Sequence, residues 1–397
     1  TETISKNGSL CKTFKASTDS HGVPKNTVLI CVILLNCFSN CYNTSEMKMS
    51  EFQYNLPEEL IAQYPVKKRG SSKLLVLDRV KGKVFDDKYF NISKYISEGD
   101  VVVLNETKVL NCRTFFITPL GKRVEVLFLE EKNDITWFAL VGRAKDVNEG
   151  DILTNEEDGD FQVVVGKRKG KGFLITFKSG NAKKLFESCG HTPLPPYMKR
   201  EDSTEDRVRY NTVFSEKLGA VAAPTASLNL TEDILDEIKA RGAIIVKIEL
   251  KIGWGTFEPV REESVEEHKV HEESFTVSKE ASSRINEVIL SNKRVWAFGT
   301  TVSRALESSA YFEKKVGKYL LKPVEGKTDL YIYPGYRWKV VDILVTNFHM
   351  PDSSLILLVS AFAGKSNIKK AYSWAIDNDY RFLSYGDSML IGDNLIK

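Results

Sequence analysis

Residues 219–257 read "GAVAAPTASLNLTEDILDEIKARGAIIVKIELKIGWGTF", a loop, a helix and a strand in that order. Thr231 suits a helix N-cap and Gly242 suits the position after the last turn, with apolar residues at helical spacing between them. Apolar and charged residues then alternate over 244–252, which predicts a strand with one buried face. The small residues ahead of the helix are typical of backbone that faces a ligand.

Two more units follow in which a strand leads through a turn into a helix. They consist of a helix over 278–291, a strand over 294–301, a helix carrying Arg304 and Glu307, a strand over 340–351 and an apolar helix from 353 to 364. Such repetition predicts a layered α/β domain around a largely parallel or mixed sheet. Upstream, we expect a short helix over 56–65 and strands at 74–79 and 100–109.

Between these parts the pattern is all β. Short strand-like runs at 123–131, 136–142, 161–166 and 172–177 are separated by turns, which predicts a small inserted β-barrel. The fold class is therefore mixed α+β and multi-domain. We expect an α/β catalytic domain from 49–110 and 196–397 and a barrel domain from 111–195.

Residues 1–48 differ from the rest, being rich in Ser, Thr, Asn and Cys with one apolar run at 28–35. A targeting segment, a translated upstream region and a disordered tail all fit this composition; we favour a non-domain extension. The apolar run is too short to span a bilayer, so no membrane association is expected.

Composition excludes a uniformly basic protein, because the formal net charge is only +3. A local basic patch remains compatible with nucleic-acid binding. Beyond residue 48 only Cys112 and Cys189 remain, too few for a disulfide framework, which indicates a cytoplasmic protein.

Three strands of the α/β part end in small or polar turns, at 253–256, 299–301 and 346–349. Ligands of open α/β sheets bind at the carboxyl ends of strands. Each turn taken alone is more simply a cap, but three together favour a site. Gly299, Thr300 and Thr301 open a helix and offer donors to an anion, which Arg304 would share.

Other chemistries are less favoured. His268 and His271 would form a metal pair if helical, but a solvated loop or a hydrogen-bonded pair fits better, so no metal is expected. No motif marks a nucleophilic Ser or Cys. Two tyrosines bracket four cations that suit RNA, namely Lys199, Arg200, Arg207 and Arg209.

Long collinear blocks resemble the S-adenosylmethionine:tRNA ribosyltransferase-isomerases of queuosine biosynthesis. They include "AVAAPTASLNLTEDIL" (220–235), "GWGTFEPV" (253–260), "FGTTVSRALES" (298–308), "TDLYIYPGY" (328–336) and "VTNFHMPDSSLILLVSAFAG" (345–364). The resemblance implies an α/β domain with an inserted barrel. It also implies transfer of the ribosyl group of S-adenosylmethionine, with isomerisation to epoxyqueuosine, onto 7-aminomethyl-7-deazaguanine at the wobble position of tRNA. Adenine and methionine are released.

The resemblance also implies roles for individual residues. Catalysis would rest on Lys251, His349 and Asn229, and the four cations from Lys199 to Arg209 would face a tRNA with a GUN anticodon. Donor-substrate binding would use Thr225, Gly253, Gly255, Thr256, Thr300, Thr301, Arg304 and Asn347. We expect a monomer.

Several positions depart from the family pattern. Ser227 replaces Gly, Asn229 and Lys251 replace His, Leu230 replaces Phe, Glu258 replaces Arg, and the order Ser-Val is reversed to Val302-Ser303. Asn cannot shuttle a proton near neutral pH. Two alternatives therefore stay open beside the family reaction: a catalytically weakened relative that still binds tRNA, and a related transferase with changed donor or base specificity.

Overall fold

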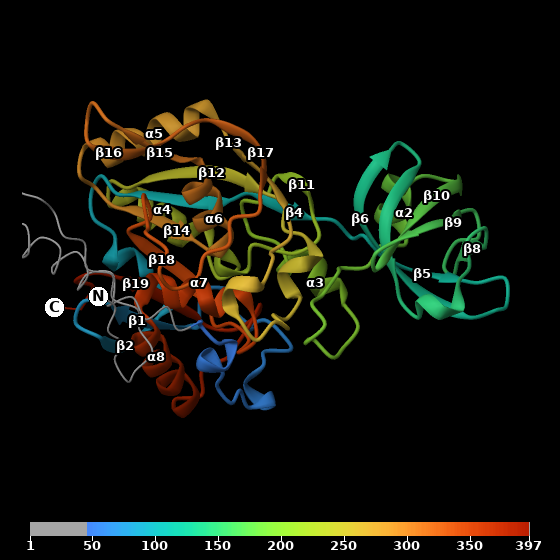
Figure 1. The fold of residues 1–397 in the computed structure, drawn as a ribbon, viewed down its shortest axis with the longest axis horizontal. Coiled ribbons are helices and arrows are strands. Elements are labelled where there is room, and N and C mark those ends of the chain that lie inside the picture. The colour runs from blue at the N-terminus through green and yellow to red at the C-terminus, as the bar shows by residue number, and fades with distance from the viewer. Residues whose placement is uncertain (1–45, 397) are drawn as a thin grey trace, which may run out of the picture. The chain divides into compact units, whose positions relative to one another are not determined.

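The computed structural model describes residues 46–396 and contains a nine-stranded mixed sheet and a closed six-stranded barrel (Figure 1). The order of strands in the sheet is β17-β13-β12-β3-β14-β18-β19-β1-β2, and in the barrel β10-β7-β6-β5-β8-β9. The α/β fold with a small β-barrel is confirmed. Residues 1–45 lie outside the described part, so the prediction for the N-terminal extension stays a prediction.

The strands and α-helices have the following bounds. The strands of the large sheet are β1 Lys73–Asp78, β2 Lys83–Lys88, β3 Val101–Asn105, β12 Ile244–Leu250, β13 Glu273–Val277, β14 Val295–Phe298, β17 Val324–Thr328, β18 Ile343–Asn347 and β19 Ser388–Gly392. The barrel strands are β5 Arg113–Ile117, β6 Arg123–Asn133, β7 Thr136–Val141, β8 Ile152–Asn155, β9 Gln162–Lys169 and β10 Gly172–Ser179. Two small sheets pair β4 Thr107–Val109 with β11 Lys217–Ala220, and β15 Ala310–Glu313 with β16 Lys318–Leu321. The helices are α2 Ala182–Ser188, α3 Thr204–Arg209, α4 Glu232–Ala240, α5 Lys279–Leu290, α6 Thr300–Ser309, α7 Ser354–Ala363 and α8 Lys365–Asp377.

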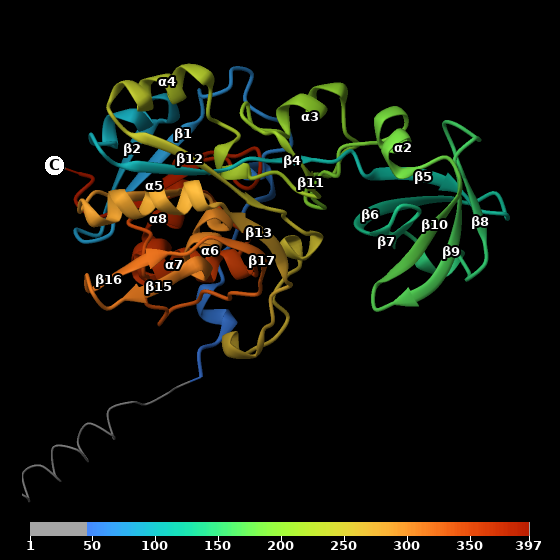
Figure 2. The same cartoon turned by 90° about the horizontal axis from the view of Figure 1, so that it is seen from above.

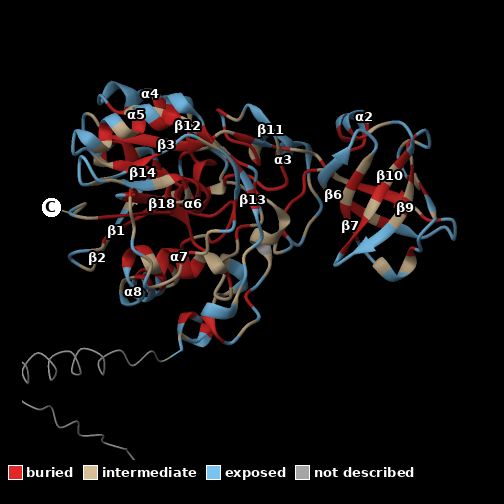
Figure 3. Ribbon diagram, turned by 45° about the horizontal axis from the view of Figure 1, so that its top comes forward, coloured by how far each residue is buried: buried red, intermediate tan, exposed pale blue. Residues whose placement is uncertain are grey.

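The large sheet has a hydrophobic core on each face, because its central strands are buried on both sides (Figure 3). In β3, Val101 and Val103 join one core while Val102 and Leu104 join the other. Helices α5 to α8 cover the first face, and α4 with the 3-10 segment Tyr89–Tyr95 covers the second (Figure 2). This three-layer arrangement explains why β14 is a continuous apolar run and why β18 begins with one.

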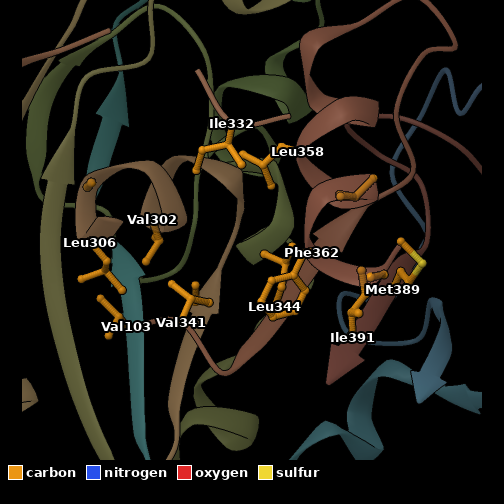
Figure 4. Close-up of a cluster of buried hydrophobic side chains, with 14 of the residues drawn as sticks. Val103, Val302, Leu306, Ile332, Val341, Leu344, Leu358, Phe362, Met389 and Ile391 are labelled. Carbon is orange, nitrogen blue, oxygen red and sulfur yellow. The ribbon is translucent and has the colours of Figure 1, made fainter. Parts of the chain in front are cut away.

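The larger core forms where α6 and α7 meet β18. Val302 and Leu306 of α6 lie in it with Leu344 of β18 and Leu358 of α7 (Figure 4). Burying side chains of this size contributes roughly 1.5–3 kcal/mol each. The start of α6 and the end of β18 are thereby held on one rigid framework.

The local signals in 219–257 are confirmed. Thr231 caps α4 by accepting a hydrogen bond from the amide of Ile234. Gly242 has a φ of 79°, the left-handed conformation expected after a helix. The alternation over 244–252 places Val246, Ile248 and Leu250 in the core.

Two upstream predictions were wrong in detail. Residues 56–65 contain only the 3-10 turn Glu58–Leu60, because the next backbone groups pair with Phe382 instead of continuing a helix. The run 100–109 splits into β3 and β4 after Asn105. The Asn105 side chain bonds both backbone groups of Leu250, and β4 pairs with β11.

The barrel is built from antiparallel pairs, as its hairpin pattern predicts. β6 pairs with β7, β9 pairs with β10, and closure comes from β5 with β8. Its core is aromatic, with Phe128 contacting Trp137, Phe177 and Phe186. These strands lie within 111–195, and those domain limits remain our proposal. Throughout 46–396, no helix combines the length and apolarity needed to cross a membrane.

Candidate functional site

The carboxyl ends of β12, β14 and β18 meet at a cavity of about 330 Å³, which we name the strand-end cavity. The three polar turns singled out in the sequence all contribute to its wall. Its lining includes Thr225, Thr256, Glu258, Gly299, Thr300, Thr301, Thr346, Asn347, His349, Asp352 and Ser384. A concave site of this size accommodates a small organic ligand.

A second cavity of about 280 Å³ adjoins the first, and we name it the histidine cavity. Thr256, Glu258, Pro259 and Leu355 line both cavities, so they form a common wall. The other residues of the histidine cavity include His268, His271, Glu273, Arg304 and Tyr331.

The charged side chains that line the strand-end cavity are acidic. Among the described residues, the lining of the strand-end cavity contains no Lys or Arg, but it includes the carboxylates Glu258 and Asp352. Burial raises the pKa of Glu258, but the hydrogen bond from Lys171 and the nearby His271 leave it below its ordinary value. A lining with this charge favours a ligand that carries a positive group.

Gly299 shapes the start of α6. Its φ of 108° lies in the region that favours glycine, and its amide bonds the carbonyl of Val345. Helix α6 therefore begins at the cavity wall, where its first backbone amides lie beside the hydroxyls of Thr300 and Thr301. A helix N-terminus of this kind attracts a carboxylate or another polar group.

Two polar residues at the end of β18 and just after it, Asn347 and His349, line the cavity. Asn347 Oδ1 is buried and has no hydrogen-bond partner within residues 46–396, while its Nδ2 lies 3.5 Å from the carbonyl of Asp387. His349 Nε2 lies 2.9 Å from Thr346 Oγ1, and the backbone of His349 is bonded by Tyr54 and Tyr372. Hydrogen bonds hold both the ring and the backbone of His349, while Asn347 keeps a buried acceptor that no described residue satisfies.

Burial lowers the pKa of His349 from 6.5 to about 3, so its imidazole is neutral at physiological pH. In the unfolded chain the imidazole of His349 binds a proton below pH 6.5, whereas in the folded protein it does so only below about pH 3. The free energy of unfolding therefore falls as the pH falls through this range. Acidification from pH 7.5 to 5 is expected to cost about 2 kcal/mol through His349. Urea unfolding of the parent and His349→Gln at both pH values measures this, since other groups are common to both; equal losses would contradict it.

Arg304 and Glu273 form a buried ion pair beside the histidine cavity. The Arg304 guanidinium also donates from Nε to the carbonyl of Leu330, at 3.0 Å. Arg304 thus lines a different cavity from Thr300 and Thr301, with which it is predicted to share an anion. Gly255 also lines the histidine cavity, and the amide of Gly253 bonds Glu273.

Asn229 and Lys251 line neither cavity. Asn229 is buried and donates from Nδ2 to the carbonyl of Gly386, at 3.3 Å, and to Ser388 Oγ, at 3.4 Å. Lys251 is exposed and its aliphatic chain passes over Gly219. Their catalytic roles stay predictions, but the structure gives Asn229 a packing role as well.

The four predicted tRNA-binding cations all have protein partners. Lys199 pairs with Glu58 and Arg200 with Asp206. Arg207 donates to the carbonyl of Gly190, and Arg209 donates to that of Val66. Lys199 and Arg207 remain exposed, so they can also contact phosphate.

His268 and His271 follow a 3-10 turn, Val265–Glu267, and are not in an α-helix. They pair separately, His268 with Glu262 and His271 with Glu258. Within residues 46–396, no group of three or more His, Cys, Asp or Glu side chains is arranged to hold a metal ion.

Sequence reasoning missed Glu273, Asp352, Tyr197 and Ser384 as residues that line or support the site. Glu273 opens β13, where its neighbours give no signal that distinguishes it from an exposed carboxylate. Tyr197 and Ser384 hydrogen-bond each other at 2.5 Å across 187 residues of sequence, a contact that local patterns do not reveal.

Comparison with known proteins identifies the family to which the chain belongs. Residues 49–391 match the family described as queuosine biosynthesis protein. Proteins named S-adenosylmethionine:tRNA ribosyltransferase-isomerase are 44% identical in Aquifex aeolicus and 46% identical in Halothermothrix orenii, each match covering 87% of this chain and 100% of the relative. A crystal structure of S-adenosylmethionine tRNA ribosyltransferase from Thermotoga maritima is 31% identical, with a TM-score of 0.49 over 86% of this chain and 99% of that one. The chain therefore belongs to the queuosine biosynthesis family of S-adenosylmethionine:tRNA ribosyltransferase-isomerases.

Proposed function

We propose that this protein transfers the ribosyl group of S-adenosylmethionine to 7-aminomethyl-7-deazaguanine at the wobble position of tRNA. The ribosyl group is isomerised to the epoxycyclopentane of epoxyqueuosine, and adenine and methionine leave. The observation that carries the proposal is the strand-end cavity, where three strand ends of a family member converge. Among the described residues, its lining includes carboxylates and no Lys or Arg.

The charge of the donor fits this cavity. S-adenosylmethionine carries a sulfonium cation, and Asp352 supplies negative charge in the wall, whereas the charge of the second carboxylate, Glu258, is partly offset by Lys171. Thr300, Thr301 and the first amides of α6 are suited to the methionine carboxylate. Thr225, Thr256 and Asn347 offer hydrogen bonds to ribose and adenine, and Gly253 and Gly255 shape the adjoining turn.

The proton steps need groups near the reacting carbon and the departing adenine. His349 lines the cavity and is neutral, so we propose that it hydrogen-bonds the ligand. Lys251 and Asn229 remain proposed as supporting groups, each standing where the family pattern has His. A loss of activity on Lys251→Ala that exceeds its effect on stability would support the role of Lys251.

We propose that the second substrate is a tRNA with a GUN anticodon, bound by a monomer in the cytoplasm without a metal. Lys199, Arg200, Arg207 and Arg209 would contact its backbone. Phosphate contacts of this kind make binding weaken as salt rises.

Release of adenine tests the proposal directly. The protein, S-adenosylmethionine and tRNA bearing the precursor base are expected to yield adenine and modified tRNA in equal amounts. Unmodified tRNA carrying guanine at the wobble position is the control and is expected to yield neither. Tight binding of tRNA without any adenine would instead favour a weakened relative, and adenine release with a different base would favour changed specificity.

A further inference from the structure

Glu273 accepts three hydrogen bonds, two from the turn after β12 and one from α6. Its Oε1 accepts from the amide of Gly253, at 3.0 Å, and from Thr256 Oγ1, at 2.8 Å. Its Oε2 accepts from Nη1 of Arg304. The side chain is almost fully buried, so these bonds form in a medium of low dielectric.

Arg304 is the other half of this arrangement. It lies four residues after Thr300, which corresponds to a rise of about 6 Å along α6. Its Nε donates to the carbonyl of Leu330 and its Nη2 lies 3.5 Å from that of Thr328, so the guanidinium points toward the histidine cavity. A unit charge at about this separation still acts on a ligand in the strand-end cavity, because burial limits screening.

We infer that Glu273 is a positioning residue that cancels the charge of Arg304 and makes the strand-end cavity prefer a cationic ligand to its uncharged analogue. The same carboxylate holds Thr256 in the wall that the two cavities share. The inference rests on the proposed function, because it takes the sulfonium of S-adenosylmethionine as the cation.

Two ligands that differ by one charge provide the test. S-adenosylhomocysteine lacks the sulfonium methyl group and its positive charge but keeps the adenosyl and amino-acid groups. In Glu273→Gln the amide oxygen can still accept from Gly253 and Thr256, while Arg304 loses its counter-charge. The ratio of the Kd for S-adenosylhomocysteine to that for S-adenosylmethionine is expected to fall about tenfold, the effect of one uncancelled charge about 6 Å away at an effective dielectric constant of about 40.

The matched control removes both charges. Glu273→Gln combined with Arg304→Met should restore the parent ratio, because the uncancelled charge of Arg304 is gone and the charges of the cavity lining are those of the parent. Calorimetric titration gives both constants, and thermal melting verifies that each variant is folded. Equal weakening of both ligands in Glu273→Gln, or a double variant that keeps the altered ratio, would overturn the inference and leave Glu273 with a structural role.

Glu273→Asp provides a second measurement if Glu273→Gln does not fold. It keeps the charge and shortens the side chain, so any change in affinity must be shared by the two ligands, and a changed ratio would overturn the inference. A parent protein that binds neither ligand would overturn the proposed function and the inference with it. A parent that binds both, with a ratio that never changes, would overturn the inference alone.

Discussion

Replacing His349 with Ala is expected to lower the turnover of adenine release by about 10²–10³-fold, the range found when one hydrogen-bonding group at a reacting centre is removed. His349 lines the strand-end cavity and its Nε2 is held by Thr346 Oγ1. In the described part of the chain its Nδ1 has no hydrogen-bond partner. Because burial keeps the ring neutral, it is suited to bond a ligand rather than to exchange protons near pH 7.

His349→Gln separates these two roles. The Gln amide is neutral and can hydrogen-bond in place of the imidazole, but it cannot take up a proton. We expect the Gln variant to keep turnover within about tenfold of the parent, and the pH profile of the parent to show no ionisation of His349 between pH 5 and 8. A Gln variant as slow as the Ala variant would show that His349 transfers a proton.

The convergence of the three turns could be predicted from sequence, because ligands of an open α/β sheet bind at the carboxyl ends of its strands and each of these strands ends in a small or polar turn. The position of Lys251 could also have been deduced. In β12 and the residues after it, Leu250 and Ile252 are buried, so alternation places Lys251 on the opposite, exposed side.

Other features could not be predicted, because they depend on segments far apart in the chain. Asn229 bonds Gly386 and Ser388 near and in β19, a strand more than 150 residues later. The missing helix at 56–65 has the same cause, since Phe382 takes its backbone bonds. Glu273 is another case: its partners Gly253 and Arg304 lie on either side of it in sequence, 20 and 31 residues away.

Replacing Glu307 with Ala is expected to have the largest effect on stability. Glu307 lies in α6, has no exposed surface, and its two oxygens accept from the amides of Lys339, Val340 and Val341 and from the hydroxyl of Tyr336. Each buried donor left without a partner costs about 1–3 kcal/mol, and partial relaxation of the segment reduces the sum. We expect a loss of about 3–5 kcal/mol, which lowers the melting temperature by roughly 10 °C.

The expected loss of stability is large because Glu307 hydrogen-bonds the segment leading into β18. That strand positions Asn347 and His349 in the lining of the cavity. Glu307→Gln should lose less than Glu307→Ala, because its amide oxygen still accepts from Val340 and Val341 while its NH₂ opposes the amide of Lys339. Glu280→Ala is the matched control, since Glu280 is exposed on α5 and, in the described part of the chain, its carboxylate pairs with Arg284 alone, a contact worth about 0.5 kcal/mol or less. Urea unfolding of the three variants measures the differences. If Glu307→Ala were no less stable than Glu280→Ala, water would have to satisfy the four donors, and the segment before β18 would be held by its apolar contacts alone.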